Sequence, residues 1–388
     1  MDVQEILALL PEELLTTLAI ESGVNRYAKK LQGEVLFKLL IHCIISYKDN
    51  SLRITACAYE SIIFGLLNID NKDKKSVRYN SISERLSTIN PDYFEKLYYA
   101  CVSIYGKEIG EPSSNLARFD STIVTLSSHL LKVGYQLPGD SAGLRQLKFT
   151  IGLSEIPTVA HLFTEQKYTS ENVALKEAIL LHQPAKSNAI RVFDRGITSR
   201  KTHDKLIKKK IPFISRINPK SKYKILSENS LKENIETPTL IIHSDEWVYL
   251  FSKEGRSNYP VRCIRAIQKE SGEEIVFVSS ISELSTTEIT DLYKKRWDIE
   301  VFFKFLKQEL NFSHLINRSE NGIKVMLYAT LIAAILLLVY KKKNKLSGYK
   351  IMKLRFVLEL ERLIMKDIVV MCDGNPKLFE KYFGKPPP

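Results

Sequence analysis

The chain has 388 residues, of which 44% are hydrophobic, and a formal net charge of +13 at pH 7. This composition argues against a disordered chain, because enough apolar residues are present to bury a sizeable core. The basic excess favours a polyanion as partner, either nucleic acid or an anionic membrane surface. The five cysteines are scattered and lack the spacing of metal ligands, so we expect reduced thiols in a cytosolic protein.

Residues 1–112 are predicted to form an all-helical domain. Leucines recur there at the three- and four-residue spacing that is typical of an amphipathic helix: Leu7, Leu10, Leu14 and Leu18. The stretch "SISERLSTINPDYF", residues 81–94, predicts a short helix, a turn and a new helix with Pro91 in its first turn. This pair is either part of a DNA-reading helix-turn-helix or part of a plain helical bundle, and the sequence leaves both open.

The periodicity changes from helical to alternating near residue 113. "RFDSTIVTLSS" is rich in β-branched residues and predicts a strand, and "LKFTIGL" with "TVAHLFT" predicts a hairpin. Helices and strands then alternate up to residue 217. Three strands followed by alternating helices and strands predict an α/β fold with a mixed sheet. Residues 218–283 hold further short strands between polar turns and predict a β-rich insertion.

Helical patterns return in residues 284–345 and continue into a C-terminal helical tail, residues 346–388. Ser285 and Glu288 have the spacing of a capping box at the first of these helices. The apolar run 325–340 has 16 residues, whereas a membrane-spanning helix needs about 20. We therefore expect a buried core helix there, with membrane association as the less favoured alternative.

The stretch "YKKRWDIEVFFKFLKQEL", residues 293–310, is predicted to be one helix with a polar stripe. On a helical wheel, Tyr293, Arg296, Glu300 and Lys307 fall within an arc of roughly 60°. The stripe borders an apolar arc formed by Leu292, Ile299, Phe302, Phe303, Leu306 and Leu310. On geometry alone, a solvated face with salt bridges would explain the stripe equally well.

The order of these polar residues is Tyr, two residues, Arg, three residues, Glu, six residues, Lys. This spacing resembles the Y-R-E-K signature of the DDE transposases of bacterial insertion sequences, specifically the insertion-sequence-four type. The resemblance implies an RNase H-like mixed-sheet catalytic core, with one carboxylate on its first strand and a second at the end of a later strand. It also implies a β domain inserted before the helix that bears the glutamate, which fits residues 218–283.

Two aspartates match the implied carboxylates. Asp120 lies within the β-branched strand "LARFDSTIV", and Asp194 ends the apolar strand of "IRVFDRGITS". Taken singly, Asp120 could be a strand-edge acid and Asp194 a helix N-cap. Ile197 departs mildly from the family, in which an aromatic residue is often found at this position.

The resemblance implies a transposase that cuts DNA at transposon inverted-repeat ends and transfers the freed 3′-hydroxyl into target DNA. Asp120, Asp194 and Glu300 would be catalytic and would hold two Mg²⁺ ions, which Mn²⁺ can replace, because hard oxygen ligands suit hard cations. The alternative is a captured, inactive transposase that acts as a non-enzymatic DNA-binding regulator.

The resemblance also implies which residues touch DNA. Tyr293, Arg296 and Lys307 would hold the transposon end, and Arg195 is a further predicted DNA contact. Trp297 could stack on an unpaired base, although core packing is an equal alternative. The expected partners are double-stranded DNA and a second copy of the chain in a synaptic complex, with no membrane, in the bacterial cytoplasm near the nucleoid.

The predicted domains follow from these patterns. They are a helical DNA-binding domain (1–112), the catalytic core in two parts (113–217 and 284–345) separated by the β-rich insertion (218–283), and the helical tail (346–388).

Overall fold

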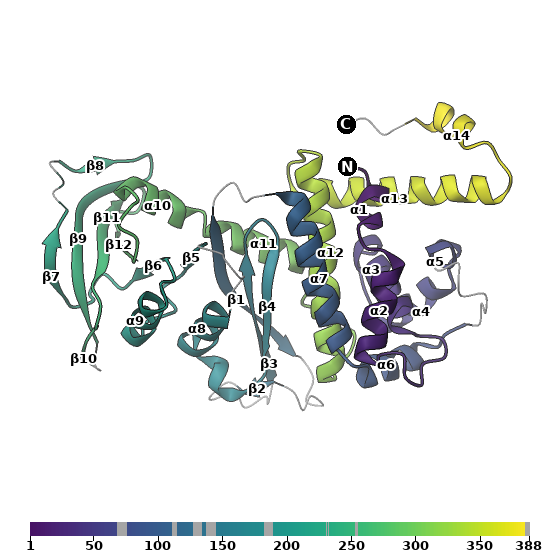
Figure 1. The fold of residues 1–388 in the computed structure, drawn as a ribbon, viewed down its shortest axis with the longest axis horizontal. Helices are drawn as coiled ribbons and strands as arrows, with labels where there is room; N and C mark the ends of the chain where they lie inside the picture. Colours follow the sequence, from purple (N-terminus) through teal and green to yellow (C-terminus); the bar gives the residue numbers. More distant parts are fainter. Residues whose placement is uncertain are drawn as a thin grey trace. The chain divides into compact units, whose positions relative to one another are not determined.

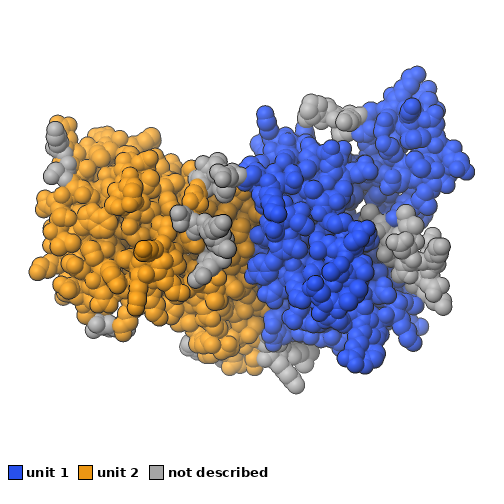
Figure 2. Space-filling model, in the orientation of Figure 1, with its two compact units in different colours: residues 1–111, 130–133, 304–388 blue, residues 112–129, 134–303 orange. Residues whose placement is uncertain are grey.

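The protein is described here by a computed structural model of the full chain. The described residues are 1–67, 76–110, 115–126, 134–136, 145–181, 189–229, 231, 233–252 and 255–384. The chain forms two compact units (Figure 2). The helical unit comprises Met1–Glu111, Leu130–Val133 and Lys304–Pro388, and the sheet unit comprises Pro112–His129 and Gly134–Phe303. The five predicted domains stay a prediction, because this grouping reflects packing alone.

A mixed sheet forms the middle of the sheet unit (Figure 1). Its central strands are β1 (Leu116–Leu126), β3 (Arg145–Leu153), β4 (Pro157–Phe163), β5 (Ile190–Phe193) and β6 (Phe213–Ile217). A short strand, β2 (Tyr135–Gln136), also pairs with β3. The β1–β3 and β3–β4 pairs are antiparallel, whereas the β1–β5 and β5–β6 pairs are parallel. The resulting order, β4-β3-β1-β5-β6, confirms the predicted RNase H-like mixed α/β fold.

Antiparallel strands extend this sheet beyond β6. They are β7 (Tyr223–Glu228), β8 (Ile235–Glu236), β9 (Leu240–Ser252), β10 (Gly255–Arg256), β11 (Val261–Gln268) and β12 (Glu274–Ser279). The pairing of β12 with β6 makes the extension continuous with the central strands. A buried ion pair joins Asp245 of β9 to Arg262 of β11 at 2.6 Å. Asp245 also accepts a hydrogen bond from Thr286 at 2.6 Å, which connects the extension to the next helix.

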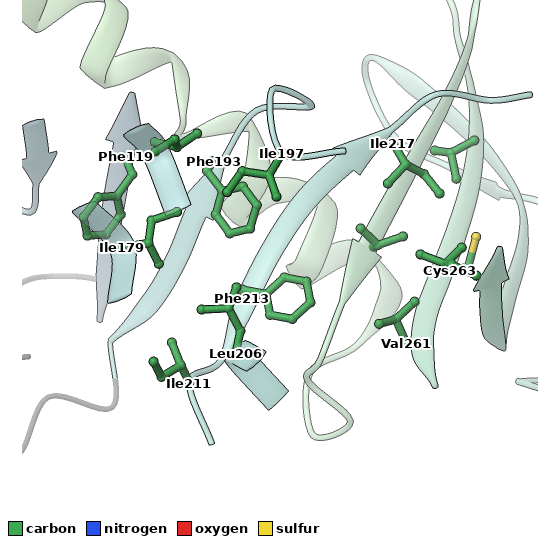
Figure 3. Close-up of a cluster of buried hydrophobic side chains, with 14 of the residues drawn as sticks. Phe119, Ile179, Phe193, Ile197, Leu206, Ile211, Phe213, Ile217, Val261 and Cys263 are labelled. Carbon is green, nitrogen blue, oxygen red and sulfur yellow. The ribbon is translucent and has the colours of Figure 1, made fainter. Parts of the chain in front are cut away.

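Helices cover both faces of the central strands. On one face lie α8 (Glu171–Leu181), which follows a 3-10 turn (Gln166–Thr169), and α9 (Arg200–Lys208). Their side chains form a core with residues of β1, β5 and β6 that includes Phe119, Ile179, Phe193, Leu206 and Phe213 (Figure 3). On the other face, Leu116, Val192 and Ile214 pack against α10 (Thr286–Lys294). Since strand side chains alternate between faces, Asp120 shares the α10 face with Leu116.

The helical unit confirms the predicted N-terminal helical region. Its helices are α1 (Val3–Ala8), α2 (Glu12–Ser22), α3 (Gly33–Ser46), α4 (Leu52–Glu60), α5 (Ile62–Leu67), α6 (Tyr79–Thr88), α7 (Asp92–Ile109), α12 (Glu320–Lys343), α13 (Tyr349–Met371) and α14 (Pro376–Phe383). By length and composition α12 could cross a membrane, yet 94% of its apolar window is buried inside the protein. It packs against α7, α3 and α6, so the predicted core helix is confirmed.

The predicted helix over residues 293–310 is wrong in one respect, because it is divided. The first part ends with α10 at Lys294, and α11 (Trp297–Glu309) starts after a turn at Lys295 and Arg296. Within this turn, the amide of Arg296 bonds to the carbonyl of Tyr293 at 2.8 Å. Such a bond spans three residues rather than four, so the turn is wound more tightly than an α-helix. A single wheel at 100° per residue therefore does not describe the stripe.

Candidate active site

The three predicted carboxylates come from three elements of the sheet unit. Asp120 lies in β1, Asp194 directly follows β5, and Glu300 is in the first turn of α11. In the parallel β1–β5 pair, Phe119 is opposite Phe193. The two aspartates are therefore the next residues along adjacent strands, and their side chains share the α10 face of the sheet.

Arg296 links the carboxylates. Its guanidinium lies 2.5 Å from Glu300 and 3.9 Å from Asp120. Its charge also lowers the pKa of Asp194. The Arg296 side chain is only 12% exposed, so a nearby negative charge is needed to stabilise it. The three acids and this arginine thus form one charged cluster within one compact unit.

The environments of the two aspartates push their pKa values in opposite directions. Burial raises the pKa of Asp120 to about 6, and the backbone amide of Ser121 and the charge of Arg296 offset this only in part. Burial would also raise the pKa of Asp194. There, however, the backbone amide of Arg195, the charge of Arg296 and the hydroxyl of Tyr293 outweigh it, and the pKa lies below its ordinary value.

Tyr293 orients Asp194. Its hydroxyl donates to Asp194 Oδ1 at 3.0 Å, and its ring packs edge-on against Phe277 at 5.2 Å between centroids. Because the tyrosine is only 7% exposed, its polar tip faces the aspartate rather than solvent. The predicted contact of Tyr293 with DNA stays a prediction.

Arg118 explains the break between α10 and α11. It lies on β1 two residues before Asp120 and is buried. Its Nε donates to the carbonyl of Lys295 at 2.8 Å, and its Nη2 pairs with Asp298 at 3.0 Å. The Lys295 carbonyl also accepts the amide hydrogen of Asp298 at 3.2 Å, so Arg118 is its second donor and holds the start of α11 against the strand that carries Asp120.

The turn after Asp194 is held by the start of α8. Asn172 Oδ1 accepts hydrogen bonds from the backbone amides of Thr198 at 2.6 Å and Ser199 at 3.0 Å. At Gly196, a Cβ atom would lie 3.1 Å from the Cβ of Glu171, which is too close for a side chain to fit without movement. The glycine of the Asp-x-Gly motif is therefore explained by contact with α8.

Sequence reasoning missed this support from α8. Glu171 pairs with Lys148 at 3.0 Å, and its charge contributes to the raised pKa of Asp120. Glutamate is common in the first turn of a helix, so Glu171 carries no distinctive signal. Lys148 does carry one, because a single lysine within the apolar stretch "LKFTIGL" predicts a buried ion pair.

The remaining predicted DNA contacts are exposed. Trp297 is 61% exposed, so the alternative that it packs in the core is wrong. Arg195 is exposed beside Asp194, and Lys307 is exposed in the last turn of α11. Arg216 on β6, which the sequence did not single out, also lowers the pKa of Asp194.

The donor set of the cluster suits a hard divalent cation. It offers only carboxylate oxygens, and the raised pKa of Asp120 marks a charge that a cation would stabilise. Among the described residues, no group of three or more His, Cys, Asp or Glu is arranged as a metal site. Arg296 supplies the counter-charge to Asp120 and Glu300 in this arrangement.

An RNase H-like sheet that brings two aspartates and a helix-borne glutamate together defines the class of DDE enzymes that act on DNA. Residues 118–336 match the model of the Transposase DDE domain family, and the chain belongs to this family. Its similarity to transposases of insertion sequences is consistent with the insertion-sequence-four type.

Three similar proteins are also named as transposases. The chain is 26% identical over 264 residues to the transposase assigned to insertion sequence element IS4SA of Synechocystis sp., covering 65% of this chain and 68% of the relative. It is 23% identical over 336 residues to the transposase assigned to element IS5377 of Geobacillus stearothermophilus, covering 82% and 85%. It is 26% identical over 207 residues to the transposase y4zB of Sinorhizobium fredii, covering 52% and 53%.

Proposed function

We propose that the chain is an active transposase, which cleaves DNA at the inverted-repeat ends of its element and joins the freed 3′-hydroxyl to target DNA. The observation that supports this most is the gathering of Asp120, Asp194 and Glu300 around Arg296. A chain that had decayed into a binding protein would have no need to keep three partly buried acids together, because such a cluster costs stability.

Each residue of the cluster has a role in this proposal. Asp120, Asp194 and Glu300 would hold Mg²⁺, two ions in the full site with Mn²⁺ as a replacement, and the metal would supply activation of the attacking hydroxyl and stabilisation of the leaving oxygen. Tyr293 keeps Asp194 ionised and oriented through its hydrogen bond. Arg296 holds Glu300 and Asp120 together through its charge.

DNA would approach along exposed residues that follow Asp194 in the chain or lie on the same helix as Glu300. Arg195 and Lys307 are exposed cations that can contact phosphates, and Trp297 offers an exposed ring on which an unpaired base can stack. The partners in this proposal are double-stranded DNA at the element ends and at the target, and a second copy of the chain in the synaptic complex. Cleavage and strand transfer would take place in the cytoplasm, at the nucleoid.

The test uses the full-length protein with duplexes that carry the ends of its own element. Strand cleavage is mapped to the nucleotide with Mg²⁺ or with EDTA, for wild type and Glu300→Gln. The variant removes one charge and keeps the side-chain shape, so DNA binding should persist while cleavage falls by orders of magnitude. Glu309→Gln, on the same helix, is the matched control and should cleave like wild type.

The alternative is a DNA-binding regulator without catalysis. Asp120→Ala separates the two, because an enzyme would retain binding and lose cleavage. Tight, specific binding by wild type with no cut under either metal would contradict the proposal and support the regulator.

A further inference from the structure

A basic hollow lies in the helical unit, between the loop that follows α2 and the start of α6. Its volume is about 730 Å³. The cations that line it are Arg26, Lys29, Lys30, Arg78 and Arg85. Among the described residues that line it, Glu84 is the single acid. A concave surface with this balance of charge attracts a polyanion.

Hydrogen bonds fix the backbone of the loop 24–31. Arg85 on α6 donates from Nε to the carbonyl of Leu31 at 2.8 Å and from Nη2 to the carbonyl of Val24 at 2.6 Å. Asn25 accepts the amide hydrogen of Gly33 at 2.7 Å. Arg85 thus fastens both ends of the loop to α6, so the cations that the loop carries have fixed positions.

Tyr27, at the tip of this loop, is held in an unfavourable backbone conformation. Its φ angle is +69°, in the left-handed region that non-glycine residues rarely adopt, and its side chain is 88% exposed. The guanidinium of Arg26 lies 5.2 Å from the centre of its ring. Strain of this kind tends to be kept where it serves binding. Here it presents an aromatic ring among cations.

The helix that follows α6 is poorly suited to bind DNA. Residues 81–94 do form a helix, a turn and a helix, but α7 is a core helix, in which Tyr93, Phe94, Leu97 and Tyr98 are fully buried. The first turn of α7 carries Asp92 and Glu95, which repel phosphate. The plain-bundle alternative for this pair is therefore the better one, and α7 is poorly suited to lie in a DNA groove.

From these observations we infer that the loop 24–31 and the start of α6 form the DNA-binding surface of the helical unit, with a DNA duplex as its ligand. Arg26, Lys29 and Arg78 contact backbone phosphates, and Tyr27 packs against sugars or base edges in a groove. This inference rests on the proposed function, because it takes the duplex that the transposase acts on as the ligand.

The first test removes three exposed charges at once, in Arg26→Gln/Lys29→Gln/Arg78→Gln. Dissociation constants for an element-end duplex are measured by fluorescence anisotropy over a series of salt concentrations. Affinity should fall at least tenfold at about 0.1 M salt, and the salt dependence should flatten, since each lost phosphate contact removes about 0.9 from the logarithmic slope. The control Lys350→Gln/Lys377→Gln/Lys381→Gln removes the same charge from exposed sites on α13 and α14 and should bind like wild type.

The second test separates binding from folding. Tyr27→Gly relieves the backbone strain, so its melting temperature should equal or exceed that of wild type while its affinity for the duplex falls. Lys96→Gln/Tyr99→Ala on the exposed face of α7 should leave affinity unchanged.

Three outcomes would overturn the inference. If wild type binds and cuts the end duplex and the loop variants bind as tightly as the α13–α14 control, the surface is wrong and the proposed function stands. If the α7 variant alone loses binding, α7 is the reading helix. If wild type neither binds nor cuts the duplex, the proposed function fails, and the inference fails with it.

Discussion

The Nε of Arg118, on β1, donates to the backbone carbonyl of Lys295 at 2.8 Å, and Lys295 lies in the turn between α10 and α11. This bond connects the strand that carries Asp120 to the turn that precedes Glu300. The same guanidinium donates to the carbonyl of Ser154 at 3.0 Å. The relative positions of the first and third carboxylates therefore depend on one buried arginine, Arg118, whose partners are two backbone carbonyls and the carboxylate of Asp298.

Arg118→Ala should destabilise the protein and impair cleavage more than DNA binding. The change removes the charged donor from two part-buried carbonyls, those of Lys295 and Ser154, at a cost of about 2–3 kcal/mol. Thermal unfolding and cleavage of an element-end duplex measure the two effects. Asp298→Asn is the control, because Asp298 is largely exposed and its pair with Arg118 should contribute less than about 1 kcal/mol. Equal losses in both variants would show that the ion pair, rather than the carbonyl contacts, holds the turn.

Asp120→Asn should make the protein more stable and inactive. The pKa of Asp120 is about 6 in the folded protein, above its ordinary value of 3.8. The folded state therefore holds the proton more tightly than the unfolded state, and stability is lost as pH rises from about 4 through about 6. At pH 7.5 in EDTA, the variant should exceed wild type by about 2 kcal/mol. Denaturant unfolding at pH 4 and pH 7.5 checks this, and a difference that does not change with pH would contradict it.

His203→Phe should reduce the sensitivity of the fold to acid. His203 is buried and stacked on Phe213 at 5.2 Å, and burial lowers the pKa of its imidazole to about 3. Only the unfolded state binds the proton between about pH 6.5 and pH 3, so this group removes stability as pH falls, by up to about 1.4 kcal/mol per pH unit. The difference in unfolding free energy between variant and wild type should grow on acidification. A constant difference would show that His203 is protonated in the folded state.

Gly196→Ala should lower cleavage with only a modest loss of stability. The new methyl group would meet the Cβ of Glu171 at 3.1 Å, so the turn after Asp194 or the start of α8 must move. A displacement of this size misplaces a catalytic carboxylate and can cost about a hundredfold in rate. Gly106→Ala is the control: Gly106 lies in α7 with no atom within 4 Å of its added Cβ, and the change should be neutral or stabilising. Unchanged cleavage by Gly196→Ala would show that the turn has room to relax.

Most residues of the candidate active site could be predicted from the sequence. The alternation around Asp120 and the apolar strand that ends at Asp194 are local patterns. The spacing of Tyr293, Arg296 and Glu300 was predictive because it resembles a family signature, although it crosses the break between α10 and α11. The burial of the apolar run in α12 was also predicted, from its 16 residues. The helix that contains it is long enough to span a bilayer, so packing inside the protein decides the matter.

Tertiary structure decided what periodicity could not express. The break at Lys295 exists because Arg118, 177 residues earlier in the chain, supplies a donor to its carbonyl. The ion pair between Glu171 and Lys148 forms only because β3 and α8 pack together, so local sequence does not reveal it. Sequence by itself determined which residue types alternate and recur, and so which segments become strands and helices. Contacts between distant segments determined where a helix stops and which charges meet, because these depend on donors and acceptors that only folding brings within reach.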